Sequence, residues 1–271
     1  MIGSANIFGR ADIRIRLGDL PGAASAFNAK VDDLLADRFV EHQTPLGDPA
    51  QEFLKRKLTV VEELIRREPI ERLIAINANG RVSVYIRGSE SQVPLPLDRT
   101  GRGDQRVWEL LAIAACATHN HPIDEGRPIG GTLSLEDILL AQQCGVQEIR
   151  VAAREATYSV TPAFGLRWDA SWATMTERAH TSLRGALDRA MAAAPGRSQQ
   201  RDLYFYLRVL DFLMIQVAKR SRLVYRRLDR PRVEWDAFIP NSRANEKEVS
   251  ATLIDDREHF AWLARLLNRR Q

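Results

Sequence analysis

Two histidines separated by a single residue are the first candidates for chemistry, because imidazole nitrogens are common metal ligands. His119 and His121 lie in the run THNHP. If this run ends a β-strand, both histidines point to one face of the sheet and Asn120 points away. Pro122 then ends the strand. The pair predicts two nitrogen donors for one metal ion, and the simpler alternative is a strand-end pair that only donates hydrogen bonds within a turn.

A carboxylate follows at the start of a predicted helix. Ser134 and Asp137 open the stretch SLEDILLAQQC, and Asp137 follows His121 by 16 residues. Two imidazoles and one carboxylate leave a position for water, which is typical of a catalytic zinc site. The alternative is a capping box, with Ser134 as the N-cap and Asp137 reaching back to it. The two interpretations are compatible, because a capped helix would also position Asp137.

A catalytic zinc site also needs a carboxylate that takes a proton from the bound water. Glu71 opens a predicted strand 48 residues before His119. A neighbouring strand of the same sheet can bring this carboxylate beside the histidines. A solvated strand-end carboxylate is equally compatible with the sequence, and Glu68 and Glu90 are the alternative bases.

The elements that must position these residues alternate between strands and helices. Asn79-Gly80 indicates a two-residue hairpin turn, and Gly145 is suited to cap the helix that Asp137 begins. Hydrophobic periodicity predicts strands over 73–76, 82–86, 92–97, 148–153 and 157–161, helices over 106–115 and 135–144, and a short strand that ends at His119.

Both flanks are predicted to be helical. Helices are expected over 23–41, around the apolar series Leu54, Leu58, Val61 and Ile65, and from Trp168 onward, including 201–228 and 258–270. The predicted organisation is an N-terminal helical extension (1–67), a core (68–165) and a C-terminal helical region (166–271).

Over residues 68–165 the motifs resemble the JAMM (JAB/MPN) zinc metallopeptidases. The shared order is a strand with a glutamate, a hairpin, a helix, a strand ending in His-Asn-His-Pro, and Ser-x-x-Asp at a helix start. HNHP is similar to the bacterial RadC-like branch. The resemblance implies an α/β fold with a mixed, cytidine-deaminase-like sheet of about five or six strands. It implies zinc bound by His119, His121 and Asp137, Glu71 as catalytic base, and the Ser134 hydroxyl supporting the oxyanion.

The activity that the resemblance implies is hydrolysis of an amide or isopeptide bond. The substrate would be a ubiquitin-like protein or its conjugates, in a bacterial and potentially antiphage system. The run IDEGRPIGG makes the loop before Ser134 longer than is usual in the family, so Asp124 or Glu125 could replace Asp137 as ligand. HNHP followed by SLEDI also resembles a module of bacteriophage head-morphogenesis proteins, in which the fold would serve assembly without turnover.

Composition restricts the remaining classes. A net charge of +4 is mildly basic, and the basic run 219–232 is more typical of a solvated helix face than of a nucleic-acid site. Cys116 and Cys144 lie among apolar residues, which predicts buried thiols rather than a disulfide framework. We expect a cytoplasmic protein without a membrane segment, since no apolar run reaches about 18–20 residues.

Overall fold

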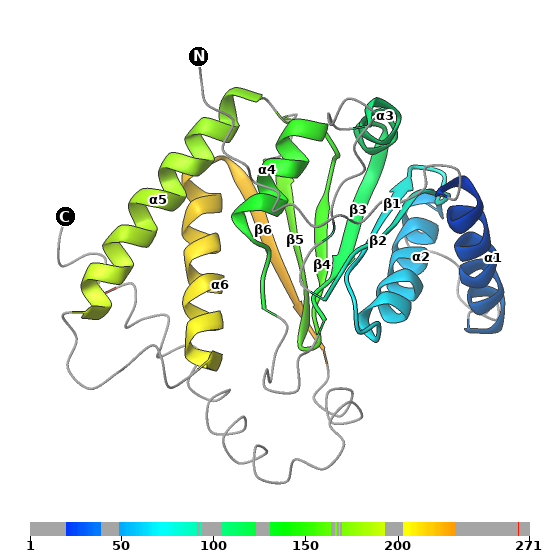
Figure 1. The fold of residues 1–271 in the computed structure, drawn as a ribbon, viewed down its shortest axis with the longest axis horizontal. Helices are drawn as coiled ribbons and strands as arrows, with labels where there is room; N and C mark the ends of the chain where they lie inside the picture. The colour runs from blue at the N-terminus through cyan, green and yellow to red at the C-terminus, as the bar shows by residue number, and fades with distance from the viewer. Residues whose placement is uncertain are drawn as a thin grey trace, which may run out of the picture.

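A single mixed sheet forms the centre of the protein (Figure 1). The computed structural model describes residues 20–38, 49–90, 93, 104–122, 131–163, 166, 168, 170–192, 203–230 and 265. Within them the sheet has six strands in the order β2-β1-β3-β4-β5-β6. The strands are β1 (Arg72–Asn77), β2 (Val82–Arg87), β3 (Ala114–Asn120), β4 (Ile149–Ala152), β5 (Ala156–Pro162) and β6 (Leu223–Asp229). β3 and β4 are parallel and the other neighbours are antiparallel, so the predicted α/β class is confirmed.

Helices cover the sheet on both faces (Figure 1). α1 (Leu20–Arg38) and α2 (Pro49–Arg66) pack on one face. On the other face lie α3 (Gln105–Ala112), α4 (Leu135–Cys144) and α6 (Leu203–Arg220), while α5 (Ala170–Ala192) packs against α4 and α6. The predicted 135–144 helix is confirmed at both ends, and Gly145 caps it in the left-handed conformation with φ +78°.

The two central layers explain the apolar run in β1. Leu73 and Ala75 face the core under α3 and α4, whereas Ile74 and Ile76 face the core under α1 and α2. A strand covered on both faces needs apolar side chains in both directions, so it loses the alternating pattern. β2, at the edge of the sheet, keeps the alternation that the sequence predicts.

The β1–β2 hairpin is confirmed, but the predicted two-residue turn is wrong. Asn77 and Arg81 flank a loop of three residues, with the Asn77 amide donating to the Arg81 carbonyl at 3.0 Å. Such loops need a left-handed residue at their last position, which Gly80 supplies with φ +79°. A Cβ at Gly80 would also lie 2.7 Å from the Phe53 ring, so α2 itself requires glycine there.

The helix predicted over 201–228 ends earlier than expected. α6 stops at Arg220, and Leu223 to Asp229 form β6, which pairs with β5 along its whole length. The exposed helix face predicted for the basic run is therefore wrong for 223–229. Leu223, Val224 and Tyr225 are β-favouring residues that suit a half-buried strand. The predicted elements 92–97 and 258–270 lie outside the described residues, apart from Val93 and Arg265.

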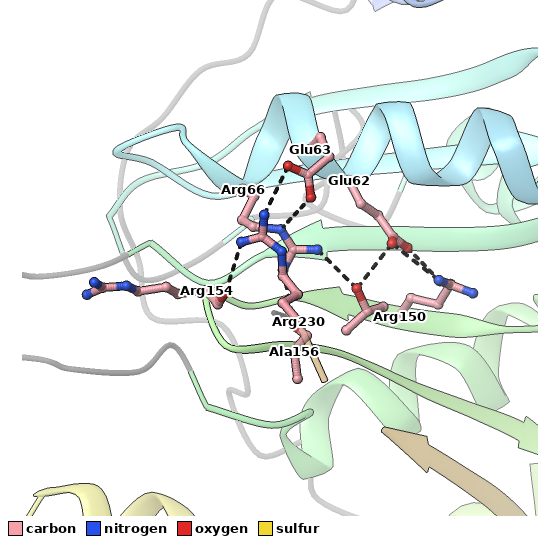
Figure 2. A network of polar contacts seen from close by, with 8 residues as sticks. Glu62, Glu63, Arg66, Arg150, Arg154, Ala156 and Arg230 are labelled. Carbon is pink, nitrogen blue, oxygen red and sulfur yellow. Dashed lines mark hydrogen bonds and ion pairs between the residues drawn. The ribbon is translucent and has the colours of Figure 1, made fainter. Parts of the chain in front are cut away.

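A buried polar network fastens α2 to the sheet (Figure 2). Arg150 on β4 donates to Glu62 on α2 at 2.6 and 3.2 Å, and the Thr157 hydroxyl donates to the same carboxylate at 3.2 Å. One turn further along, Arg66 donates to the Ala156 carbonyl at 3.1 Å. Because these groups are largely withdrawn from water, each charge depends on its partner.

We expect Glu62→Leu to lower the free energy of unfolding by about 3 kcal/mol, because it leaves Arg150 with a weakened set of partners in a buried setting. The double variant Glu62→Leu, Arg150→Met should regain most of that loss, since neither charge is then buried. Urea unfolding measures both. Asp188→Asn, which breaks an exposed pair with Arg184, is the control and should change little. A double variant less stable than the single one would contradict the interpretation.

Candidate metal centre

The predicted site residues meet at one edge of the sheet for topological reasons. β3 and β4 are parallel neighbours joined through α4, so the first turn of α4 lies near the carboxyl end of β3. β1 runs antiparallel to β3, with Leu73 paired to His119. Continuing this register by two residues places Glu71, which directly precedes β1, beside His121.

Three donor atoms converge there. The Nε2 atoms of His119 and His121 are 3.3 Å apart, and Asp137 Oδ1 lies 3.3 Å from His119 Nε2. The three donors all lie within 4.8 Å of one another. Among the described residues, this is the cluster of histidine, cysteine and carboxylate side chains that is compact enough for a metal ion.

The spacing of the donors fits zinc. Zinc binds nitrogen and oxygen ligands at about 2.0–2.1 Å in tetrahedral geometry, which separates neighbouring donors by about 3.3–3.4 Å. The two printed separations around His119 Nε2 are both 3.3 Å. Two imidazoles and one carboxylate are also the ligand types of catalytic rather than structural zinc sites. The chemistry and the size of the donor set therefore agree.

Neighbouring groups orient each ligand before any metal binds. Asp137 Oδ2 accepts from the Ser134 amide at 2.7 Å and from the Ser134 hydroxyl at 2.8 Å, which leaves Oδ1 toward His119. The Ser134 hydroxyl in turn accepts from the Asp137 amide at 3.1 Å, completing the capping box that the sequence offered as an alternative. His119 also hydrogen-bonds the backbone of Arg150, and Nδ1 is the ring nitrogen left for that bond.

Protonation equilibria reflect the same contacts. Burial alone raises the pKa of Asp137, but the charge and hydrogen bond of His119, with His121 and the Ser134 backbone, bring it well below its usual range. Burial alone lowers the pKa of His119, but Asp137 and then Glu71 raise it above 6.5. Without metal, His119 and Asp137 thus form an ion pair at neutral pH. Binding a cation there displaces the imidazolium proton.

Glu71 has the properties of a proton carrier at neutral pH. Its side chain is half-buried, and burial is the largest cause that raises its pKa from 4.5 to about 7, with His119 lowering the value and Asp137 raising it. A carboxyl group of this pKa exchanges protons readily near pH 7. The alternative base Glu68 forms an ion pair with Arg72 at 2.9 Å, and Glu90 is exposed. Asp124 and Glu125 lie outside the described residues.

Sequence reasoning missed the residues that hold the end of the long loop before α4. The buried Glu155 carboxylate accepts from the Gly131 amide at 3.1 Å and from the Tyr158 hydroxyl at 2.8 Å. Thr132 and Tyr225, on β6, share a hydrogen bond of 2.6 Å. The late strand β6 therefore supports the segment that leads into Ser134. The sequence signal was an acidic residue inside the apolar runs of VAAREATYSV.

Comparisons with protein-family models, with curated proteins and with solved structures found no match to this chain. The fold and the geometry of the site are accordingly the grounds on which a function can be argued. None of the helices in the described ranges has the length and apolarity needed to cross a membrane.

Proposed function

We propose that this protein is a zinc-dependent peptidase or isopeptidase of the JAMM type. The observation that carries the proposal is the set of three donors, His119, His121 and Asp137, at separations suited to tetrahedral zinc. A carboxylate whose pKa is raised to about 7 lies in the electrostatic field of two of these donors. The parallel β3–α4–β4 unit and the antiparallel β1 support the JAMM-like, cytidine-deaminase-like core implied by the sequence motifs.

The residues divide the chemistry between them. Zinc at such a site supplies a bound water with a pKa near about 7 and polarises the scissile carbonyl. Glu71 takes the proton of that water and delivers it to the leaving amine. Ser134 orients Asp137 through its amide and hydroxyl. For Ser134 also to support the oxyanion, its hydroxyl must turn away from Asp137 when substrate binds.

The proposed substrate is the C-terminal tail of a ubiquitin-like protein joined to a lysine, in the cytoplasm of a bacterium and as part of a conjugation or antiphage system. This class follows from the likeness of HNHP and Ser-x-x-Asp to JAMM motifs. Nucleic acid is a weaker candidate, because two arginines of the basic run are already paired. Arg227 binds Asp211 at 3.0 Å, and Arg230 binds Glu63 at 3.1 Å.

The test combines metal analysis with cleavage of a ubiquitin-like fusion carrying a reporter on its C-terminal tail. The purified protein should hold about one zinc per chain. Removing the metal with a chelator should abolish cleavage, and adding zinc should restore it, because the water is then activated again. The control is the double variant His119→Ala, His121→Ala, which should stay inactive with added zinc.

Two results would contradict the proposal. Cleavage that persists in the chelator would show that the donor cluster is not needed. A folded, zinc-loaded protein that cleaves neither linear nor lysine-linked fusions would favour the assembly module without turnover, as in the phage head-morphogenesis resemblance.

A further inference from the structure

Asn120 lies between the two histidines in the sequence but serves the other face of β3. Its side chain is fully buried, at 0% exposure, on the side of the sheet away from the histidine donors. Its Oδ1 accepts from the Arg72 amide at 2.7 Å. Its Nδ2 donates to the Ile70 carbonyl at 3.1 Å and the Glu68 carbonyl at 3.3 Å. All the hydrogen-bonding capacity of the carboxamide toward strong partners is thereby directed at residues 68–72.

These bonds surround Glu71. Ile70 and Arg72 are its direct neighbours, so Asn120 holds the backbone on both sides of it. On the side of β2, the Glu71 amide donates to the Ser89 carbonyl at 2.7 Å, and the Glu71 carbonyl accepts from the Gly88 amide at 2.8 Å. The backbone that carries Glu71 is therefore fixed from two directions, by the β2 end and by a side chain of β3.

We propose that Asn120 is a positioning residue for Glu71, and that it sets the distance between the proton-carrying carboxyl and the donors on its own strand. This inference rests on the proposed function and deepens it. The residue types agree with the role, since only a carboxamide of this size offers one acceptor and two donors. Leucine has the same shape without either function, and aspartate offers acceptors alone.

The expected consequence is a fall in kcat with little change in binding. Loss of three hydrogen bonds frees residues 68–72 to shift relative to β3. A misplacement of about 1 Å in a reacting group costs about 100-fold in rate. For Asn120→Leu we expect kcat to fall about ten- to hundred-fold, with KM and zinc content close to those of the wild type.

The experiment uses the zinc-loaded full chain, the fusion substrate, and hydrogen exchange of single amides. In Asn120→Leu the Arg72 amide should exchange faster than in the wild type, because its acceptor is gone, while His119 and His121 still bind zinc. Asn120→Asp is a second variant that keeps the acceptor for Arg72 but offers no donor to the two carbonyls. It should retain protection at Arg72 and still lose kcat.

Asn28 provides a matched control. This carboxamide also clamps backbone, donating to the Val82 carbonyl at 3.0 Å and accepting from the Val82 amide at 2.9 Å, at the opposite end of the β1–β2 hairpin. Asn28→Leu should lower stability in the same way and leave kcat, KM and Arg72 exchange unchanged. A fall in kcat that is equal in Asn28→Leu and Asn120→Leu would reduce Asn120 to a general stabiliser and overturn the proposal.

Other outcomes also decide the matter. If Asn120→Leu loses zinc in proportion to activity, Asn120 acts on the histidines and the proposal for Glu71 is wrong. Unchanged kcat and unchanged Arg72 exchange would reject it as well. If the wild type itself neither binds zinc nor cleaves the fusion, the proposed function fails. Hydrogen exchange at Arg72 and the place of Glu71 in a crystal structure of Asn120→Leu then decide separately whether Asn120 holds this segment.

Discussion

Asp137→Asn is expected to weaken zinc binding by more than about 100-fold, since loss of a mere outer-sphere partner already costs about 10–100-fold. Asparagine keeps the size of the side chain and can still accept from Ser134, so the start of α4 should remain intact. What it removes is the negative charge whose Oδ1 lies 3.3 Å from His119 Nε2. A zinc competition titration against a chromophoric chelator measures the affinity directly.

The neighbouring carboxylate offers a control for this prediction. Glu136 lies in the same first turn of α4 but is exposed and outside the donor cluster. Glu136→Gln changes the net charge as much as Asp137→Asn does and should leave zinc affinity within a factor of about two, since an exposed charge is screened. Zinc affinity that survives in Asp137→Asn would exclude this carboxylate as a ligand and remove the main support for the hydrolase.

Glu71→Gln is expected to abolish cleavage and retain the metal. Glutamine cannot carry a proton between water and the leaving amine, and loss of a general acid–base group costs about 100- to 10,000-fold in rate. The three zinc donors are untouched by the substitution. Steady-state cleavage of the fusion, together with zinc content, gives both readouts. The matched control is Glu68→Gln, which breaks the ion pair with Arg72 and should leave most of the activity.

The same variant has a second effect that needs no substrate. Burial raises the pKa of Glu71 from 4.5 to about 7 in the folded protein, so between these values the folded state binds more protons than the unfolded state. The free energy of unfolding therefore falls as pH rises from 4.5 to about 7 and then levels off. With partial solvent screening, the loss should be about 1–2 kcal/mol.

Glutamine does not ionise, so Glu71→Gln should escape this loss. In metal-free protein its advantage over the wild type should be small near pH 4.5 and largest above pH 7, as measured by urea unfolding across that range. An advantage that does not change with pH would mean that the Glu71 carboxyl is not disfavoured as an anion. If Glu68→Gln rather than Glu71→Gln abolished cleavage, the role of base would pass to Glu68.

Much of the local architecture follows from the sequence alone. Periodicity predicted both strands of the first hairpin, the helices on either side of it, and the strands that became β4 and β5. The spacing of two between His119 and His121 was enough to predict one shared face, because side chains alternate along a strand. The cap at Ser134 and its partner Asp137 were predictable for the same reason, since helix ends are satisfied by residues three positions apart.

Other features depend on contacts between distant parts of the chain. The sequence left Glu71 and Glu68 as rivals, and only the antiparallel pairing of β1 with β3 brings Glu71 opposite the end of the histidine strand. The role of Asn120 was hidden for the same reason, because its partners lie 48 to 52 residues earlier.

The basic run shows most clearly what the tertiary structure decided. Leu223 to Asp229 are charged enough to suggest a solvated helix, yet the open side of β5 pairs with them as β6. Arg227 is then neutralised by Asp211 of α6, which the sequence gives no reason to place nearby. Local sequence determines period, caps and the chemical types of the donors. Which strands pair, and in which register, is decided by the burial of whole faces, and that energy arises only when the segments meet.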